Sequence, residues 1–428
     1  MRILVLGSGG REHAIIRKIK ESPKVDKIYA APGNGGISKD AECIDIGVMD
    51  KEGIVAFSKE NAVDIVFVAP DDPLAAGMVD TLTANGIRAF GPRAEAAVIE
   101  SSKVFSKNLM KKYNIPTADY EVFDDPAKAV EYIENKNRYP VVIKADGLAL
   151  GKGVIIAQTH KEAREAVKEI MEDKKFGDSG NKVVVEEYLT GPEVSVLAFT
   201  DGISLVPMVS SKDHKRAYDN DEGLNTGGMG TISPNPYYTP EIAEICRKTI
   251  FEPTVAAMNS ENRTFKGCLY FGLMITPDGP KVIEYNARFG DPEAQVVLPR
   301  LKTDLVDIIE AVIDERLSQV SIEWKEEAAA CVVMASGGYP LAYKKGLEIT
   351  GLDENGQISG AEIFHAGTKL EKGKFYTNGG RVLGVTAEAK TLEEALAKAY
   401  TAVSKISFEG AHYRTDIGKT KYTRMYKH

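Results

Sequence analysis

The chain has 428 residues, of which 43% are hydrophobic and 27% are charged, and its formal net charge is −8. This composition is typical of a globular chain with an ample core, and the length predicts about two to four domains. The negative charge argues against a general nucleic-acid-binding protein, and no apolar run approaches the length of a membrane span.

Residues 1–100 alternate short apolar runs with segments of helical spacing. The predicted strands are Arg2–Leu6, Lys27–Ala30, Asp64–Ala69 and Ile87–Phe90. This alternation predicts an α/β domain with a doubly wound parallel sheet, whose ligands lie beyond the carboxyl ends of the strands. Because the first strand begins at Arg2, no room is left for a signal peptide, and we expect a cytoplasmic protein.

A glycine-rich loop follows the first strand, in the sequence Leu6-Gly-Ser-Gly-Gly-Arg-Glu-His13. It departs from the GxGxxG dinucleotide motif because Glu12 stands at the third glycine position, which argues against NAD binding. A helix that begins at such a loop still presents free N–H groups and a positive dipole end to a phosphate. Arg11 adds a charged donor. The loop therefore predicts a phosphate site.

From about Ser101 the pattern predicts a second, α+β domain that extends over residues 101–326. Its expected elements are a helix Lys103–Lys112, strands Val141–Lys144, Val154–Ala157, Val183–Tyr188 and Val194–Thr200, and a hairpin with arms Cys268–Thr276 and Lys281–Ala287. Thr239-Pro240 and Asp291-Pro292 each predict a helix start with the first residue as the cap. The polar stretch 210–236 lacks apolar periodicity and predicts a long functional loop.

Residues 327–428 predict a last α+β module. We expect a strand Ala328–Ala335, a hairpin around Asn378-Gly-Gly-Arg381 and a helix from Thr391 to Ser404. The four cysteines are far apart and follow no disulfide or zinc pattern, which indicates thiols in a reducing compartment.

The segment Tyr139–Val154 carries glycines and lysines between two predicted strands. Three residues separate Gly147 from Gly151, and Gly153 follows Lys152, so the segment is not a Walker P-loop. A flap at the tip of a β-hairpin fits better, with its N–H groups closing over phosphates. The alternative is a flexible hairpin with solvated lysines.

Two further segments carry acidic groups. Val185-Glu-Glu-Tyr-Leu-Thr-Gly-Pro-Glu193 could accept hydrogen bonds from an adenine amino group or ribose hydroxyls, although alone it is more typical of a hairpin with charged edges. Along Lys281–Ala287 the side chains alternate, so Glu284, Asn286 and Arg288 fall in one row. Oxygen ligands of this kind suit Mg²⁺ or Mn²⁺, and the arginine can grip an adjacent anion. A half-exposed strand with scattered polar residues is the alternative.

Together these segments resemble the ATP-grasp ligases over about residues 101–320. The resemblance implies that ATP and a divalent metal, Mg²⁺ or Mn²⁺, bind here, with Glu284 and Asn286 as the metal ligands. It implies nucleotide contacts by Lys103, Lys144, Gly151, Lys152, Gly153, Glu186, Glu187, Leu189 and Glu193.

Other motifs resemble one ATP-grasp family from end to end, the phosphoribosylamine–glycine ligases. They include Gly-Ser-Gly-Gly-Arg-Glu-His-Ala14, Ala-Pro-Gly-Asn34, Asp-His-Lys-Arg216, Asn-Thr-Gly-Gly-Met-Gly230 and Arg-Phe-Gly-Asp-Pro-Glu293. The resemblance implies ATP-dependent ligation of glycine to 5-phosphoribosylamine through glycyl phosphate, in de novo purine biosynthesis. It implies catalytic or substrate contacts by Gly9, Gly10, Arg11, Glu12, Gly33, Asn34, Asp213, Lys215, Asn225 and Arg288. It also leads us to expect a monomer.

The match has departures and open alternatives. Asp71 stands where the family usually has glutamate, and Leu224 replaces a usual proline. His214 is as consistent with a structural as with a catalytic histidine. Two rival functions remain: an ATP-grasp enzyme with another acceptor, such as a biotin-type carboxylase or a formate-dependent ligase, and a non-enzymatic nucleotide-binding module.

Overall fold

The computed structural model describes residues 1–148 and 153–419. Its N-terminal residues form a parallel sheet of order β3-β2-β1-β4-β5, as predicted. Alternate residues of β1 pack on opposite faces. Leu4 lies in one apolar cluster with Ile54, and Ile3 lies in another with Ile16, so helices cover both sides. The elements are β1 Arg2–Gly7, α1 Gly10–Lys20, β2 Lys27–Pro32, η1 Ile37–Lys39, β3 Glu42–Cys43, α2 Lys51–Glu60, β4 Ile65–Val68, α3 Asp71–Ala75, α4 Met78–Ala84, β5 Arg88–Phe90 and α5 Ala94–Ser101.

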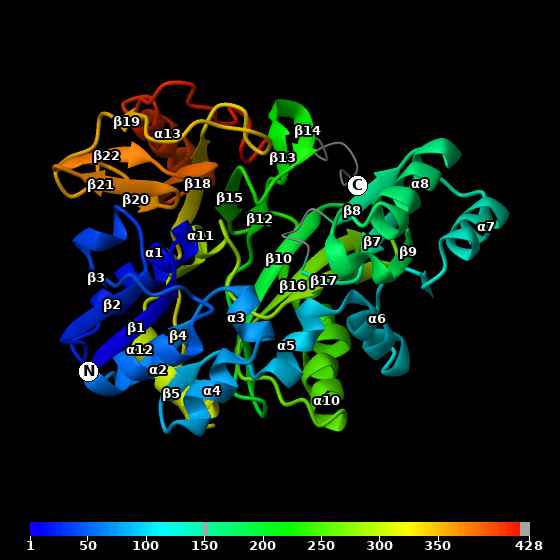
Figure 1. Ribbon diagram of the computed structural model, residues 1–428, viewed down its shortest axis with the longest axis horizontal. Helices are drawn as coiled ribbons and strands as arrows, with labels where there is room; N and C mark the ends of the chain where they lie inside the picture. The colour runs from blue at the N-terminus through cyan, green and yellow to red at the C-terminus, as the bar shows by residue number, and fades with distance from the viewer. Residues whose placement is uncertain (149–152, 420–428) are drawn as a thin grey trace.

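A separate lobe follows helix α6 (Lys103–Lys112) and lies on the right in Figure 1. Its antiparallel sheet has the order β6-β9-β7-β8. Strands β7 and β8 pair with each other, which confirms the predicted hairpin flanks. The lobe contains β6 Tyr120–Phe123, α7 Pro126–Lys136, β7 Val141–Ala145, β8 Val154–Ala157, α8 His160–Val167, η3 Lys168–Glu172, η4 Gly177–Asn181 and β9 Val183–Glu187.

The central sheet has the order β11-β10-β16-β17, and β16 and β17 form the predicted hairpin. Thr239 caps α9 through its side chain, with Pro240 at the first position, as expected. The elements are β10 Glu193–Thr200, β11 Leu205–Pro207, α9 Pro240–Cys246, η6 Arg247–Phe251, α10 Glu252–Ser260, β16 Gly267–Thr276, β17 Gly279–Asn286, α11 Ala294–Val297, η7 Leu298–Arg300, α12 Leu305–Ile313 and η8 Leu317–Gln319.

The prediction of one long loop over 210–236 was wrong in its secondary structure. The stretch contains β12 Lys212–Asp213, β13 Arg216–Tyr218, β14 Glu222–Asn225 and β15 Gly230–Ser233. β15 pairs with β18 (Ala328–Ala335), a strand about a hundred residues away, with Thr231 opposite Cys331. Because that partner supplies the backbone hydrogen bonds, the strand needs no apolar periodicity of its own.

The last residues complete a sheet of order β12-β15-β18-β23-β20, which therefore combines strands from either side of residue 326. Beside it lie a sheet of order β19-β22-β21 and helix α13. The predicted hairpin at Asn378–Arg381 was wrong because the flanking strands, β22 and β23, belong to different sheets. The elements are β19 Glu348–Ile349, β20 Glu362–His365, β21 Thr368–Glu371, β22 Lys374–Thr377, β23 Arg381–Ala389 and α13 Leu392–Val403.

Candidate active site

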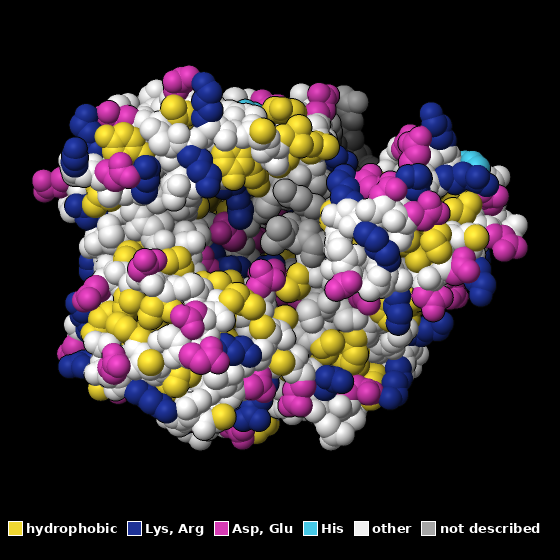
Figure 2. Space-filling view, in the orientation of Figure 1, with side chains coloured by type: hydrophobic (Ala, Val, Ile, Leu, Met, Phe, Trp, Pro, Cys, Tyr) yellow, Lys and Arg dark blue, Asp and Glu magenta, His cyan; other side chains and the backbone are white. Residues whose placement is uncertain are grey.

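The glycine loop between β1 and α1 meets the end of strand β17. Arg11 donates from Nη1 to the carbonyl oxygen of Phe289 (3.1 Å), and its backbone N–H donates to Oδ2 of Asp291 (3.3 Å). The predicted phosphate loop and the predicted metal-binding strand therefore lie side by side. Figure 2 shows that the molecule is hollowed at the centre of the displayed face, with acidic and basic side chains around the hollow.

Glu12 shapes the glycine loop from inside. Its carboxylate accepts hydrogen bonds from the Gly9 N–H (2.7 Å) and from Nε of Arg11 (2.7 Å), and the residue is only 2% exposed. Gly7 has a φ of +122°, and a Cβ there would lie 2.5 Å from Cγ of Glu12. A Cβ on Gly10 would lie 2.5 Å from the side-chain nitrogen of Gln295. The loop therefore needs these glycines for close packing.

A second loop, after β2, lies against the first. The Gly33 N–H donates to the carbonyl oxygen of Gly7 (3.1 Å). The Asn34 side chain donates to the carbonyl oxygens of Ser8 (2.9 Å) and His365 (2.8 Å). Its oxygen accepts from the N–H groups of residues 36 and 37 (2.9 Å each). The side chain of Asn34 thus binds protein backbone on all sides.

The predicted row at the end of β17 is present. Asn286 accepts a hydrogen bond from Arg288 (3.3 Å), and Arg288 pairs with Glu100 (2.8 Å). Glu284 lies 3.2 Å from Nζ of Lys215. Lys215 is the largest cause that lowers the pKa of Glu284 to about 2, against the effect of burial, so this carboxylate is ionised at neutral pH.

The donor set of this row fits a hard cation. Glu284 supplies an ionised oxygen ligand, and Asn286 supplies a neutral one on the same face. Within residues 1–148 and 153–419, no group of three or more His, Cys, Asp and Glu side chains could hold a metal ion.

Lysines approach this row from the lobe and from α6. Lys144 on β7 donates to the carbonyl oxygen of Ile283 (3.1 Å), and its Nζ lies 3.0 Å from Oε1 of Glu186. Lys103 donates to the carbonyl oxygen of Gly147 (2.6 Å), and burial lowers the pKa of its ammonium group. The two lysines extend the positive charge opposite Glu284.

Sequence reasoning missed one buried lysine of this group, Lys107. Its Nζ lies 3.0 Å from Oε2 of Glu186 and donates to Oγ1 of Thr117 (2.8 Å). Burial is the main cause that lowers its pKa to about 8. The spacing of four from Lys103 was the available signal, since residues four apart share one face of a helix.

The remaining predicted nucleotide residues differ in placement. Glu186 is buried between Lys144 and Lys107. Glu187 is half-buried and pairs with Lys281 (3.2 Å). Leu189 is half-buried, and Glu193 is exposed at the start of β10. Gly153 accepts a hydrogen bond from the N–H of residue 145. The predicted contacts Gly151 and Lys152 lie outside the described residues.

The predicted acceptor-side residues lie on β12 and its neighbours. Asp213 accepts a hydrogen bond from the N–H of His214 (2.7 Å). Burial and then the nearby charge of Glu293 raise the pKa of Asp213 well above its usual range. Lys215 follows β12, and Asn225 ends β14, where it is half-buried. Burial and the charge of Glu293 thus oppose ionisation of the Asp213 carboxyl, and the charges of Lys215 and Arg381 favour it.

The structure distinguishes between the alternative interpretations of His214 and of Asp291. The His214 ring lies 3.1 Å from the carbonyl oxygen of Gly230, and its Nε2 accepts from the N–H of Gly418 (3.1 Å), which is the structural alternative. The prediction that Asp291 caps a helix was wrong, since Glu293 is the N-cap of α11. Asp291 instead pairs with Arg381 (3.2 Å), a charged partner from β23 that local sequence could not reveal.

The two positions that depart from the family pattern differ in their relation to the site: against the effect of burial, the charges of Glu100 and then Asp71 raise the pKa of Arg288. Asp71 begins α3, and Leu224 is 52% exposed on β14. Within the described part of the chain, no helix is both long and apolar enough to span a membrane.

The fold and this arrangement of lysines, carboxylates and glycine loops define an ATP-grasp enzyme. Family models match this chain in three consecutive parts. They are described as the N domain (residues 1–100), the ATP-grasp (A) domain (101–294) and the C domain (329–420) of phosphoribosylglycinamide synthetase. The chain belongs to the phosphoribosylglycinamide synthetase family.

Relatives agree along the whole length. A phosphoribosylamine–glycine ligase of Clostridium acetobutylicum is 48% identical over 98% of this chain and 100% of its own. A trifunctional purine biosynthetic protein adenosine-3 of Gallus gallus is 50% identical over 97% of this chain and 42% of its own. The crystal structure of phosphoribosylamine–glycine ligase from Thermotoga maritima has a TM-score of 0.85 and 34% identity, covering 97% of this chain and 99% of that one.

More distant structures share the fold alone. The biotin carboxylase domain of 2-oxoglutarate carboxylase from Hydrogenobacter thermophilus has a TM-score of 0.73 at 16% identity, and covers 96% of this chain and 91% of that one. The likeness to this carboxylase domain therefore concerns the fold and does not carry its activity to this chain.

Proposed function

We propose that this chain is the ligase that joins glycine to 5-phosphoribosylamine, with ATP cleaved to ADP and phosphate, in purine biosynthesis. The observation that carries the proposal is the contact of Arg11 with Phe289 and Asp291, which sets the glycine loop beside the row of Glu284 and Asn286. A phosphate-binding loop beside a phosphoryl-transfer site suits an acceptor that itself bears a phosphate. Relatives of this name that match from end to end support the same reaction.

In the first step, a carboxylate oxygen of glycine attacks the γ-phosphorus of ATP, and ADP leaves. Glu284 and Asn286 would hold Mg²⁺ or Mn²⁺, which supplies positive charge to the phosphate oxygens. Lys103 and Lys144 stabilise the transferring group from the other side, and Gly151, Lys152 and Gly153 are proposed to close over it. Catalysis of this kind depends on positioning and charge, so no nucleophilic side chain is needed.

In the second step, the amine of phosphoribosylamine attacks the carbonyl carbon of glycyl phosphate, phosphate leaves, and the amine loses a proton. The backbone N–H groups of the loop Gly9–Glu12 and of the Gly33–Asn34 loop would hold the sugar phosphate at the N-terminus of α1. Arg288 is proposed to orient the glycine carboxylate or the acyl phosphate. Asp213 is proposed to receive the ammonium end of glycine, whose charge would offset the burial and the nearby Glu293 charge that raise the pKa of Asp213. Lys215 and Asn225 are proposed as further contacts of the substrate.

The nucleotide base is assigned to the lobe side of the site. Glu186, Glu187, Leu189 and Glu193 follow one another along the end of β9 and the start of β10. Their carboxylates and backbone groups can accept hydrogen bonds from adenine and ribose. Lys144 and Lys107 neutralise Glu186 in the chain without ligand.

The division into residues 1–100, 101–326 and 327–428, a cytoplasmic location and a monomeric state complete the proposal. Three of the four cysteines are buried as free thiols, which is consistent with a reducing compartment. Light scattering at several protein concentrations tests the monomeric state, and a mass that rises with concentration would contradict it.

The deciding experiment measures ADP release with glycine and freshly made phosphoribosylamine, leaving out each in turn. We expect release only when both are present. The rival ligases predict release with bicarbonate or formate instead, and the non-enzymatic module predicts nucleotide binding with no release under any condition.

A further inference from the structure

His365 at the end of β20 contacts both N-terminal loops through its backbone, and the carbonyl oxygen of Thr368 adds a bond from the Gly35 N–H (3.0 Å). The N–H of His365 donates to Nδ1 of His13 on α1 (2.8 Å). The carbonyl oxygen of the same residue accepts from the side chain of Asn34 (2.8 Å). Both backbone groups of His365 are thus bound by side chains that lie 331 and 352 residues earlier in the chain.

The protonation state of His13 follows from its partners. A backbone N–H can only donate, so Nδ1 of His13 is unprotonated and the proton sits on Nε2. Nε2 then donates to Oδ2 of Asp40 (3.1 Å). Burial lowers the pKa of His13, which is 0% exposed, so the neutral ring is the stable form.

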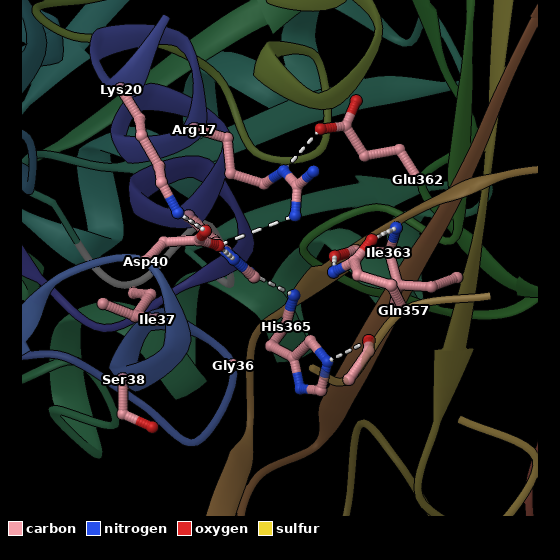
Figure 3. Close-up of polar contacts among 12 residues, drawn as sticks. Arg17, Lys20, Gly36, Ile37, Ser38, Asp40, Gln357, Glu362, Ile363 and His365 are labelled. Atoms are coloured by element: carbon pink, nitrogen blue, oxygen red, sulfur yellow. Dashed lines mark hydrogen bonds and ion pairs between the residues drawn. The ribbon is translucent and has the colours of Figure 1, made fainter. Parts of the chain in front are cut away.

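Asp40 is fixed in turn by basic residues of α1. Lys20 lies 2.8 Å from Oδ1 and Arg17 lies 3.6 Å from Oδ2, as Figure 3 shows. Burial alone would raise the pKa of Asp40, but the hydrogen bonds from His13 and Lys20 outweigh it and lower the pKa. Arg17 also reaches Glu362 on β20 (2.6 Å), which makes a second, more exposed contact between α1 and that strand.

The side chain of Asn34 has no capacity left for a ligand. Its two N–H donors are used by the carbonyl oxygens of Ser8 and His365, and its oxygen accepts from the N–H groups of Gly36 and Ile37. A Cβ on Gly36 would lie 2.2 Å from the His365 ring, so the two loops are in close contact.

We propose that His13 and Asn34 are positioning residues that grip the backbone of His365 and thereby hold the glycine loop 7–11 in its phosphate-binding geometry. This inference rests on the proposed function for its substrate readout. It differs from the family resemblance in assigning Asn34 to the support of the loop instead of contact with substrate. The coupling runs from His365 through Asn34 to the carbonyl oxygen of Ser8, and through His13 to helix α1.

Two substitutions of His13 test its two hydrogen bonds separately, the one from the His365 N–H and the one to Asp40. Asparagine places an acceptor near the Nδ1 position, so His13→Asn keeps the bond from the His365 N–H. Glutamine places a donor near the Nε2 position, so His13→Gln keeps the bond to Asp40 and leaves the His365 N–H without a partner. Glu362→Gln is the control, because it weakens the other contact between α1 and β20 without touching His365.

The experiment measures KM for phosphoribosylamine, ATP and glycine, together with hydrogen exchange of peptides that span residues 7–11. We expect His13→Gln to raise KM for phosphoribosylamine about fivefold or more, as for an unsatisfied buried hydrogen-bond donor. Its loop should exchange faster, while KM for ATP and glycine stays unchanged. His13→Asn and Glu362→Gln should resemble the parent in all four readouts.

Equal effects of the two His13 variants would overturn the inference, since loss of packing would then explain them. A rise in KM for ATP alongside that for phosphoribosylamine would also overturn it. If the parent protein shows no turnover with phosphoribosylamine, the proposed function fails, and the exchange of residues 7–11 still decides whether the grip exists. Unchanged hydrogen exchange of residues 7–11 in His13→Gln would show that the bond between His13 and His365 does not hold the loop, whatever the kinetics show.

Discussion

The lobe of residues 120–187 and the body that carries it are held together in different ways. Within the described residues, the apolar cluster of the lobe contains only residues of the lobe itself, such as Ile133, Val141 and Val185. One cluster of the body instead combines Ile3, Phe199, Phe289 and Val333, which come from all three sequence regions. The lobe therefore has a core of its own, whereas this cluster of the body combines residues from all three sequence regions.

The charged contacts between lobe and body surround the nucleotide side of the site. Lys144 reaches the backbone of β17, Glu187 reaches Lys281, and Glu186 reaches Lys107 on α6. The acceptor side, by contrast, lies wholly within the body. We therefore expect nucleotide binding to depend on how the lobe meets the body, and acceptor binding to depend on a site that is already assembled.

The largest expected effect falls where the two regions meet, at Glu284. Glu284→Ala should reduce kcat about a hundredfold or more, because one transition-state charge contact is worth roughly 3 kcal/mol. Steady-state kinetics at saturating Mg²⁺ measure the loss, and circular dichroism checks the fold. Glu261→Gln, which alters an exposed pair with Lys112, should retain full activity. Activity of Glu284→Ala near that of the parent would remove Glu284 from the metal site.

A lobe-specific effect is expected from Lys144. Lys144→Met should weaken binding of a non-hydrolysable ATP analogue about tenfold or more, since a charged hydrogen bond is worth about 1.5–3 kcal/mol. Phosphoribosylamine binding should change little. Titration calorimetry measures both, and an unchanged affinity for the analogue would show that Lys144 makes no phosphate contact.

The body-specific counterpart is Arg11. Arg11→Ala should raise KM for phosphoribosylamine about tenfold, from the loss of one charged hydrogen bond, with KM for ATP and glycine unchanged. A rise in all three values would mean that the glycine loop and the nucleotide site are not separate, and the contrast between body and lobe would break down.

The smallest effect concerns stability and Lys107. Its folded pKa is about 8, below the usual 10.5, so the unfolded chain binds more protons between these values. The free energy of unfolding should therefore rise with pH from about 8 to 10 through this residue, by roughly 1–3 kcal/mol. Urea unfolding of the parent and of Lys107→Met measures the difference. Parallel pH profiles of the two proteins would show that Lys107 titrates normally.

Local sequence patterns predicted the elements whose signals lie within a few residues. The helix at Lys103–Lys112 begins after the side-chain cap Ser102, and β8 and β18 have the predicted ends. The fold class followed from the alternation in residues 1–100. The residues proposed for the site were found through recurring motifs, since spacing alone left each of them with an ordinary alternative.

The failures share a physical cause, which is a partner distant in sequence. β12 and β15 exist because β18 extends their sheet. Asp291 leaves the capping position because Arg381 and Arg11 attract it. The Asn-Gly-Gly sequence at Asn378–Arg381 favoured a hairpin turn, but the segment connects strands of two different sheets. Lys107 was overlooked because a lysine on a helix is ordinarily solvated, and only its burial against Glu186 makes it unusual.

The grip on His365 also bears on how the chain folds during its synthesis. Helix α1 emerges from the ribosome early, but its partners on β20 emerge more than three hundred residues later. Until then Ile15, Ile16 and Ile19, all 0% exposed in the folded chain, lack part of their cover. Such delayed long-range contacts slow folding and prolong the exposure of apolar surface. The nascent chain therefore exposes part of this apolar face until β20 has been made.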